Sequence, residues 1–393
     1  MQRRKHQKTN YNKKGLSKFA RSTAFVSIFF CSFLIGYLLT NSFRSTKSNI
    51  PKKEPQQSLE IKKILEGPTT KERSKWYLAL IKRVGPEQAQ EDLQHSGISF
   101  TGESHLLNHV VGNYLYKKFG PAGITKCKDY FSSSCYHGVI IDAIGGGKLN
   151  NIEIMLSECK KNGKPAYAQC SHALGHGFLA WAGYRNLLKA LTMCNDIHQK
   201  VSDFDLYYCH NGVFMENVWG LHEGKPSPDA WLKSDDLHYP CDDPRIEPQY
   251  QPACWYNQAF QMNHMLNGDS VKVAFECLKA PDEASQNTCF DGVFRGLSSS
   301  TQGDLDTKFR VCRQMPEGWK EKCIGIQAGA GFQQGDRILP FTICARSTEQ
   351  EKTTCYTDLQ DMIRYYITNK IQQELLCKKI PHVYQGGVCQ ELQ

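Results

Sequence analysis

The sequence contains 17 cysteines in 393 residues but not one C-x-x-C pair. Zinc sites usually place two thiolate ligands within two to four residues of each other, so this absence argues against zinc as the use of these cysteines. The motif C-x-x-C-H is missing as well, which excludes covalently attached c-type haem. So many cysteines are unusual for a reduced cytosolic enzyme, and the explanation we favour is a set of disulfide bonds in an oxidising compartment.

Several enzyme motifs are also absent. The chain has no phosphate-binding G-x-x-x-x-G-K-[ST], no dinucleotide-binding G-x-G-x-x-G, no H-E-x-x-H and no G-x-S-x-G. A strongly basic body is missing too, because eight of the 48 basic residues lie in residues 1–21, which contain no acidic residue. The rest of the chain carries 40 basic against 39 acidic residues. Because nucleic-acid binding needs a clustered basic face, no nucleic-acid partner is expected.

Residues 22–43 lack any charged side chain. A helix of this length spans about 33 Å at about 1.5 Å per residue, enough for a hydrocarbon core of about 30 Å. The basic stretch precedes it, so the N-terminus is expected in the cytoplasm and the rest of the chain outside it. A cleaved signal peptide is the alternative, but its apolar part is usually 7–15 residues long and ends in a small-residue cleavage site, which is missing here.

Four segments follow from this interpretation. Residues 1–21 form a cytoplasmic basic segment, residues 22–43 a transmembrane signal anchor and residues 44–70 a flexible tether rich in Lys, Glu, Pro, Gln and Ser. Residues 71–393 form an extracytoplasmic α-helical repeat domain. We expect a single-pass protein held in the membrane through residues 22–43, with its C-terminal domain in the periplasm, outside the cell or in a lumen.

The 16 cysteines outside the apolar segment fall into eight couples whose members lie 8–15 residues apart. The second cysteines of successive couples recur every 32–45 residues, a period typical of stacked repeats. Six of the seven intervals from the second cysteine of one couple to the first of the next are 21–24 residues, which fits two short helices and a turn. The predicted disulfides are Cys127–Cys135, Cys159–Cys170, Cys194–Cys209, Cys241–Cys254, Cys277–Cys289, Cys312–Cys323, Cys344–Cys355 and Cys377–Cys389.

The residues after each second cysteine show helical periodicity. Apolar side chains recur at three- and four-residue steps in segments such as CYHGVIIDAI and CFDGVFRGL. We therefore predict an all-α fold of disulfide-stapled helical-hairpin repeats, either an open α/α solenoid or a closed α/α toroid, behind a single N-terminal transmembrane helix. Glycines recur three residues after the cysteine, at Gly138, Gly212 and Gly292, and predict a close approach between helices.

Upstream of the first couple, a cysteine-free repeat begins near Ser104, because its Ser-His-x-x-x-His pattern matches that of a later repeat. Two short helices at Lys75–Arg83 and Glu87–His95, separated at Gly85, predict a cap over the first repeat. The repeat period resembles that of tetratricopeptide-type helical hairpins. The consensus residues of that family are absent, so the resemblance implies architecture alone.

Histidines concentrate at two positions of the first three repeats. Counted from the second cysteine, positions +2 and +6 hold five of the 13 histidines, and residues four apart share one face of a helix. Paired imidazoles on a helix are an arrangement that metal sites use. A sixth histidine stands at position +1 of the fourth repeat. The candidate metal ligands are His105, His109, His137, His172, His176 and His210.

Repeat spacing limits how these ligands can combine. Packed helices lie about 10 Å apart, so in a straight stack the pairs His105/His109 and His172/His176 would be about 20 Å from each other. One ion could then join a single pair to His137 in the intervening repeat. In a closed ring the inner helices would converge, and more ligands would become available.

Carboxylates at position +7 extend the candidate site. Asp142 and Glu216 stand there and are candidate ligands or general bases for catalysis. Three protein ligands with an open position would suit a catalytic zinc, whereas two histidines and a carboxylate would suit iron. Two explanations without metal stay open: the histidines could line a polar groove, or they could cap and pack neighbouring repeats.

Two functions of different class follow. The first is a binding scaffold, in which stacked hairpins present a concave face to a protein, a peptide or a glycan. The second is a metal-dependent enzyme with a His-rich site, using zinc or iron. We favour the scaffold slightly, because repeat architecture commonly serves binding and no complete catalytic motif is present. The metal content of the purified protein would discriminate between the two.

Overall fold

The computed structural model describes residues 56–96, 102–128, 130–131, 133–145, 149–220, 226–301, 303–333 and 335–392. Within these ranges every regular element is a helix, which confirms the all-α prediction. The segments predicted at 1–21 and 22–43 lie outside the described residues. Among the helices that are described, none has the length and apolar character needed to cross a bilayer. The chain divides after Glu54, and the description below concerns Pro55–Gln393 alone.

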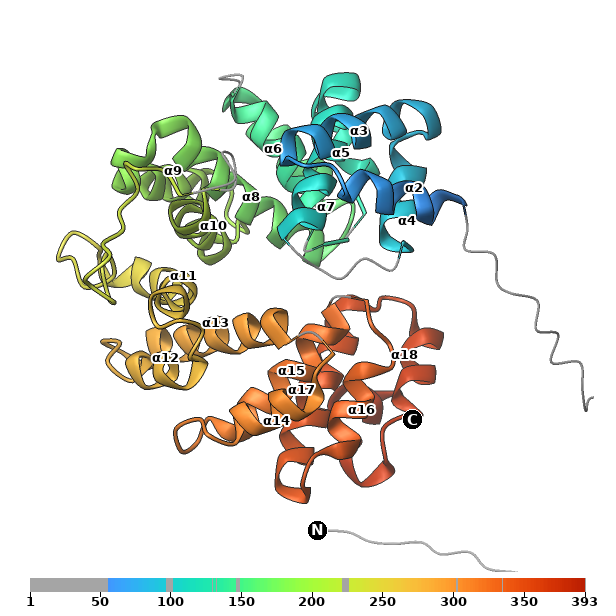
Figure 1. Cartoon of the computed structure of the whole chain (residues 1–393), viewed down its shortest axis with the longest axis vertical. Coiled ribbons are helices and arrows are strands. Elements are labelled where there is room, and N and C mark those ends of the chain that lie inside the picture. Colours follow the sequence, from blue (N-terminus) through green and yellow to red (C-terminus); the bar gives the residue numbers. More distant parts are fainter. Residues whose placement is uncertain are drawn as a thin grey trace, which may run out of the picture. The chain divides into compact units, whose positions relative to one another are not determined.

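The helices are short and follow one another closely along the chain (Figure 1). The α-helices are α2 Gln56–Leu65, α3 Thr70–Val84, α4 Pro86–Gln94, α5 Gly102–Phe119, α6 Ser134–Gly145, α7 Ile152–Lys160, α8 Lys164–Ala182, α9 Leu187–Lys200, α10 Leu206–Trp219, α11 Gln251–Met265, α12 Ser270–Cys277, α13 Glu283–Thr301, α14 Leu305–Cys312, α15 Lys320–Gln333, α16 Leu339–Arg346, α17 Glu349–Tyr366, α18 Lys370–Cys377 and α19 Gly387–Glu391. The 3-10 helices are η1 Gly120–Lys126, η2 Leu149–Asn151, η3 Tyr184–Asn186, η4 Pro248–Tyr250 and η5 His382–Tyr384.

All eight predicted cysteine couples form disulfides, with Cα atoms 5.3–6.5 Å apart. Six of them join a cysteine of one short helix to a cysteine of the next helix, as Cys159 of α7 is joined to Cys170 of α8. The helices that carry the second cysteines pack against one another in chain order, from α6 through α8, α10, α11, α13 and α15 to α17. These six disulfides therefore close the connections between helices that follow each other along the chain.

At the N-terminal end of the fold, the two predicted cap helices are present, and a further helix lies in the segment predicted to be a tether. Helices α3 and α4 meet at Gly85, whose positive φ of 92° suits glycine, and they pack on α5 as the predicted cap does. Helix α2 lies inside the segment predicted to be a flexible tether up to residue 70. Its Ile61 and Ile64 are buried in the core, so residues 56–65 belong to the folded body and are no tether. The prediction missed this helix because its segment is mostly polar. Its few apolar side chains lie on one face of the helix, and that is sufficient for it to pack.

Glycines let neighbouring helices touch backbone to backbone at the level of the histidines. A Cβ atom added at Gly138 of α6 would overlap the carbonyl oxygen of His109 on α5. At Gly212 of α10 it would overlap the carbonyl oxygen of His172 on α8. Real Cβ atoms do not approach backbone oxygens so closely, so only glycine fits. The predicted close approach of the repeats is confirmed at these two positions.

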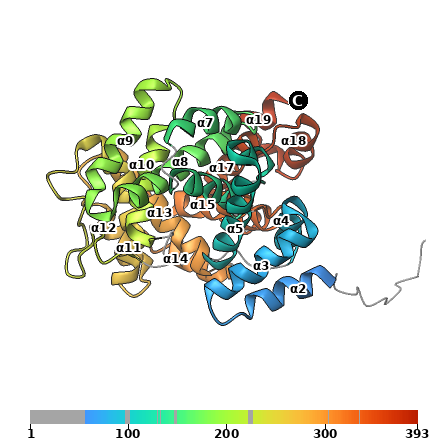
Figure 2. The ribbon, with the colours of Figure 1, turned by 90° about the horizontal axis from the view of Figure 1, so that it is seen from above.

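A helix from the C-terminal part of the chain also contacts a helix from the N-terminal half. Helix α17 contacts α8, although α8 ends at Ala182 and α17 begins only at Glu349 (Figure 2). The side chain of Tyr365 on α17 bonds that of Tyr208 on α10. Helices that lie far apart in the sequence are therefore in contact in the folded chain.

Candidate metal centre

Five of the six candidate histidines gather in one buried cluster. The histidine cluster consists of a first pair on α5, a second pair on α8 and a single ring on α6 between them. The five side chains are only 0–8 % exposed. The members of the cluster are His105 and His109 (the first pair), His137, and His172 and His176 (the second pair).

His137 contacts all four other rings. Its centroid lies 5.2 and 5.4 Å from those of the first pair and 5.3 and 5.2 Å from those of the second pair. Only the width of this one ring therefore separates the two pairs, and the wide separation expected for a straight stack is wrong. The backbone contact at Gly138 between α5 and α6, and the inward direction of the side chains from three neighbouring helices, bring the pairs together.

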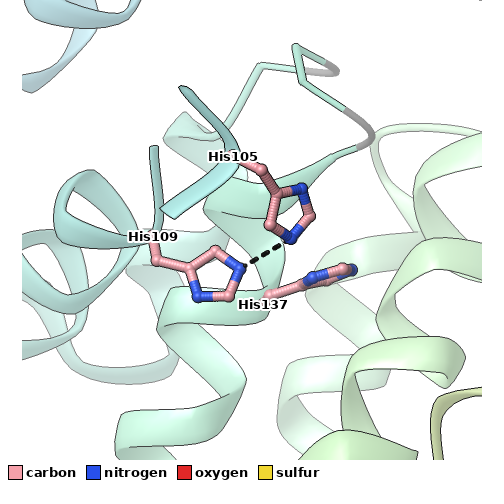
Figure 3. A group of neighbouring side chains, drawn as sticks. All are labelled: His105, His109 and His137. Carbon is pink, nitrogen blue, oxygen red and sulfur yellow. Dashed lines mark hydrogen bonds between the residues drawn. The ribbon is translucent and has the colours of Figure 1, made fainter. Parts of the chain in front are cut away.

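The first pair presents two ring nitrogens to one point (Figure 3). The Nε2 atoms of His105 and His109 are 3.0 Å apart. Two nitrogen ligands of a tetrahedral zinc ion would lie about 3.3 Å apart for Zn–N bonds of about 2.0–2.1 Å. Together with His137, this pair offers one ligand nitrogen per ring within 4.8 Å of one another.

A backbone oxygen fixes the tautomer in the first pair. Nδ1 of His105 lies 2.8 Å from the carbonyl oxygen of Phe131. Because a carbonyl oxygen only accepts hydrogen bonds, Nδ1 carries the proton and Nε2 keeps its lone pair. Metal-ligating histidines almost always hold their second nitrogen in this way, which orients the ring and leaves the other nitrogen able to coordinate.

The second pair repeats this arrangement with a carboxylate. Nε2 of His172 and Nε2 of His176 are also 3.0 Å apart. Nδ1 of His176 donates to Glu216 Oε2 at 2.9 Å, and the other carboxylate oxygen accepts from the hydroxyl of Tyr184. Both His176 and Glu216 are fully buried. This carboxylate–histidine contact sets the lone pair of His176 on Nε2, facing its neighbour.

His137 is the unsatisfied member of the cluster. It is 2 % exposed, and among the residues that the structure describes neither of its ring nitrogens has a hydrogen-bond partner. A buried polar group left without a partner costs about 1–3 kcal/mol. A neutral imidazole has one donor and one acceptor nitrogen, so His137 carries this cost twice. Each unmade hydrogen bond in a native structure calls for an explanation, such as a ligand.

Burial keeps three imidazoles of the cluster uncharged, those of His105, His137 and His172. Desolvation lowers the pKa of His105 to about 4, and it holds the pKa of His137 and of His172 well below the usual 6.5. For His137 the nearby rings of the two pairs lower the pKa further. Neutral imidazole is the form that binds metal ions, so these three rings are in the protonation state that coordination requires at neutral pH.

The stability of the metal-free protein is expected to fall with acid. The pKa of His105 is about 4 in the folded protein against 6.5 when exposed, so the unfolded chain binds the proton more readily between these values. Its contribution to the free energy of unfolding is present above pH 6.5 and is lost as the pH falls towards 4. Between pH 7 and pH 5 we expect a loss of about 2 kcal/mol from His105 alone.

Urea unfolding of the EDTA-treated protein at pH 7, 6 and 5 measures this loss. In His105→Gln the free energy of unfolding should fall less between pH 7 and pH 5, by the amount that His105 contributes. In His264→Gln it should vary with pH as in the wild type, because His264 is exposed. Parallel profiles for the wild type and His105→Gln would contradict the assignment.

The other sequence candidates lie against different partners. Nε2 of His210 bonds Asn195 Oδ1 at 2.9 Å, its ring packs edge-on against Tyr250, and burial lowers its pKa to about 4. Asp142 forms an ion pair of 3.6 Å with Lys117 of α5. The structure thus brings five of the six candidate histidines together and links Glu216 to them through His176. His210 instead contacts Asn195 and Tyr250.

Three partners of the cluster were missed by sequence reasoning. They are the carbonyl of Phe131, the hydroxyl of Tyr184 and the backbone of Tyr208, which bonds His172. A backbone group leaves no trace in a sequence, so two of these contacts had no signal to find. Tyr184 directly follows the glycine that ends α8, and only its position beside α10 gives it a role.

No protein-family model, curated protein or solved structure matches this chain.

Proposed function

We propose that this protein binds a transition-metal ion in the histidine cluster. The observation that carries the proposal is His137, a buried ring with two unpartnered nitrogens set between two imidazole pairs whose Nε2 atoms already converge. A bound ion would satisfy the lone pair of His137 and would replace the pairwise contacts between neighbouring rings. The proposal develops the metal-dependent alternative that the sequence suggested. It concerns the binding of a metal ion and assigns no catalysed reaction.

The ligand chemistry selects the ion. Imidazole nitrogens suit zinc, copper, iron and nickel, whereas magnesium and calcium require oxygen ligands. The carboxylate of Glu216 accepts hydrogen bonds from His176 and Tyr184, so it orients a ligand and is not itself a ligand. Three histidines with an open fourth position match the usual ligand set of a catalytic zinc site, which fits zinc better than the two-His-one-carboxylate set of non-haem iron.

The burial of the site restricts what a bound ion could act on. The five rings are almost fully buried, so access is limited to water and other small molecules unless helices move. A large peptide or glycan substrate does not fit this description. The scaffold hypothesis therefore needs a different surface of the protein, and binding of a protein, a peptide or a glycan stays a prediction.

The setting of the site is part of the proposal. Eight disulfides suit an oxidising compartment, and the uncharged segment 22–43 after a basic N-terminus suits a membrane anchor that exports the body. We interpret the helical hairpins as a repeat array that curls inward, a proposal that the contact between α8 and α17 supports. Such curvature would turn the inner helices, and the histidines they carry, towards one another.

Metal analysis of the purified chain tests the proposal. After EDTA treatment and titration with Zn²⁺ or Cu²⁺, we expect stoichiometric binding by elemental analysis and calorimetry. His137→Ala should weaken binding by at least tenfold, and Glu216→Gln by about 10–100-fold through the orientation of His176. The exposed His264→Ala is the matched control and should bind as the wild type does.

Folding of each variant is checked by circular dichroism and by retention of all eight disulfides. If the wild type takes up no metal, or if His137→Ala and His264→Ala bind alike, the proposal fails. Apo protein should also gain stability on binding, by about 2.7 kcal/mol at an ion concentration 100 times the dissociation constant.

A further inference from the structure

We infer that His137 bridges two metal ions, each held by one histidine pair. The inference rests on the proposed function and goes beyond it in the number of ions and in the role of one ring. It is carried by the position of His137 between the two pairs, by the two unpartnered nitrogens of that ring, and by the equal Nε2–Nε2 distance of 3.0 Å within each pair.

The two pairs are equivalent half-sites. Each consists of two histidines four residues apart on one helix, with Nε2 atoms 3.0 Å apart. Each contains one ring whose Nδ1 is held by an oxygen acceptor, a backbone carbonyl for His105 and a carboxylate for His176. A pair whose lone pair is oriented in this way is prepared to coordinate an ion by itself, and the cluster contains two such pairs on two different helices.

His137 would supply the third ligand of both half-sites, and the structure already brings its nitrogen and those of the first pair within 4.8 Å of one another. The two nitrogens of an imidazole lie on different edges of the ring, and the four neighbouring rings surround His137 at 5.2–5.4 Å. In Figure 3 one nitrogen of His137 lies on the side of the first pair and the other lies farther from that pair. A mononuclear site would use one nitrogen and leave the other buried without a partner, whereas two ions would satisfy both.

A bridging His137 loses one proton. Neutral His137 carries one N–H proton, which must leave to the solvent when its second nitrogen binds an ion. Two divalent ions bring four positive charges, of which the imidazolate ring and the carboxylate of Glu216 offset two. Each ion then has three nitrogen ligands and an open position that can take an anion such as hydroxide. Joint binding of the two ions should therefore release at least one proton per chain.

Titration of the EDTA-treated full chain with Cu²⁺ tests the bridge. We expect two ions per chain and a low-temperature electron paramagnetic resonance signal far below that of two isolated ions, because an imidazolate bridge couples the two spins. Calorimetry in buffers of different ionisation enthalpy measures the proton release. The exposed His264→Ala should retain both the stoichiometry and the spin coupling.

Two further variants separate the half-sites. His105→Ala/His109→Ala should retain one ion at the second pair, and His172→Ala/His176→Ala should retain one ion at the first, each with a full uncoupled signal. His137→Ala should abolish the coupling. One ion per chain in the wild type, or two ions with full uncoupled signal, overturns the bridge and leaves metal binding intact. No bound ion overturns both.

Discussion

Complete reduction of the protein in non-denaturing buffer is expected to abolish its cooperative thermal unfolding. The eight disulfides close short loops, with sequence separations from 8 to 15, and the chain-entropy model assigns about 2.5–3 kcal/mol to each loop of this length. Even without full additivity, a sum of about 20 kcal/mol exceeds the roughly 5–15 kcal/mol of net stability that is typical of folded proteins. Removal of all eight therefore leaves too little stability for the fold.

Circular dichroism melts with and without reductant measure this effect, and intact mass verifies the redox state. Reduction should add about 16 hydrogens, and alkylation should rise from one group, at Cys31, to one on each of the 17 cysteines. Cys377→Ala/Cys389→Ala is the limited control: it removes only the last disulfide and should cost about 2–5 kcal/mol while unfolding stays cooperative. An unchanged melt after verified reduction would contradict the prediction.

Gly212→Ala is expected to destabilise the protein by on the order of 3 kcal/mol and to weaken metal binding, because the new Cβ would overlap the carbonyl oxygen of His172. Backbone cannot yield as a flexible side chain does, so α10 must move away from α8. Glu216 lies on α10 and holds His176 on α8, so the same movement disturbs the ligands. Urea unfolding and calorimetric titration with Zn²⁺ measure the two effects.

Gly296→Ala on α13 is the matched control. There the new Cβ would meet only the ring of Phe260, at an ordinary 3.6 Å. Alanine is favoured over glycine in helices by about 1 kcal/mol, so this variant should be stabilised by up to that amount and should bind metal normally. If Gly212→Ala behaves in the same way, the backbone contact between α8 and α10 does not set the geometry of the cluster.

Much of the fold could be predicted because its signals are local. Closely spaced cysteine couples indicated the disulfides, and three- and four-residue apolar steps indicated the helices between them. The prediction of a tether was wrong for residues 56–65 because α2 has only a small apolar face, in which Ile61 and Ile64 are buried within a segment of polar composition. The anchor at 22–43 stays a prediction of the sequence.

In the candidate site, too, the local features could be predicted and the contacts between helices could not. Four-residue spacing placed His105 beside His109 and His172 beside His176, because residues four apart share a helix face whatever the surroundings. Spacing could not tell that His210 turns to Asn195, nor that Glu216 reaches His176 from the next repeat. Those contacts depend on the directions in which neighbouring helices present their side chains.

The sequence by itself determined the helices, the pairing of the cysteines and the two histidine pairs, since each is governed by the spacing of residues along the chain. Only the tertiary structure decided that both pairs meet at His137 and that, within the part of the chain it describes, this ring is buried without a hydrogen-bond partner. The physical reason is that the distance between neighbouring helices depends on how closely their backbones pack. Between the first pair and His137 that distance is set by the contact of Gly138 with the backbone of His109.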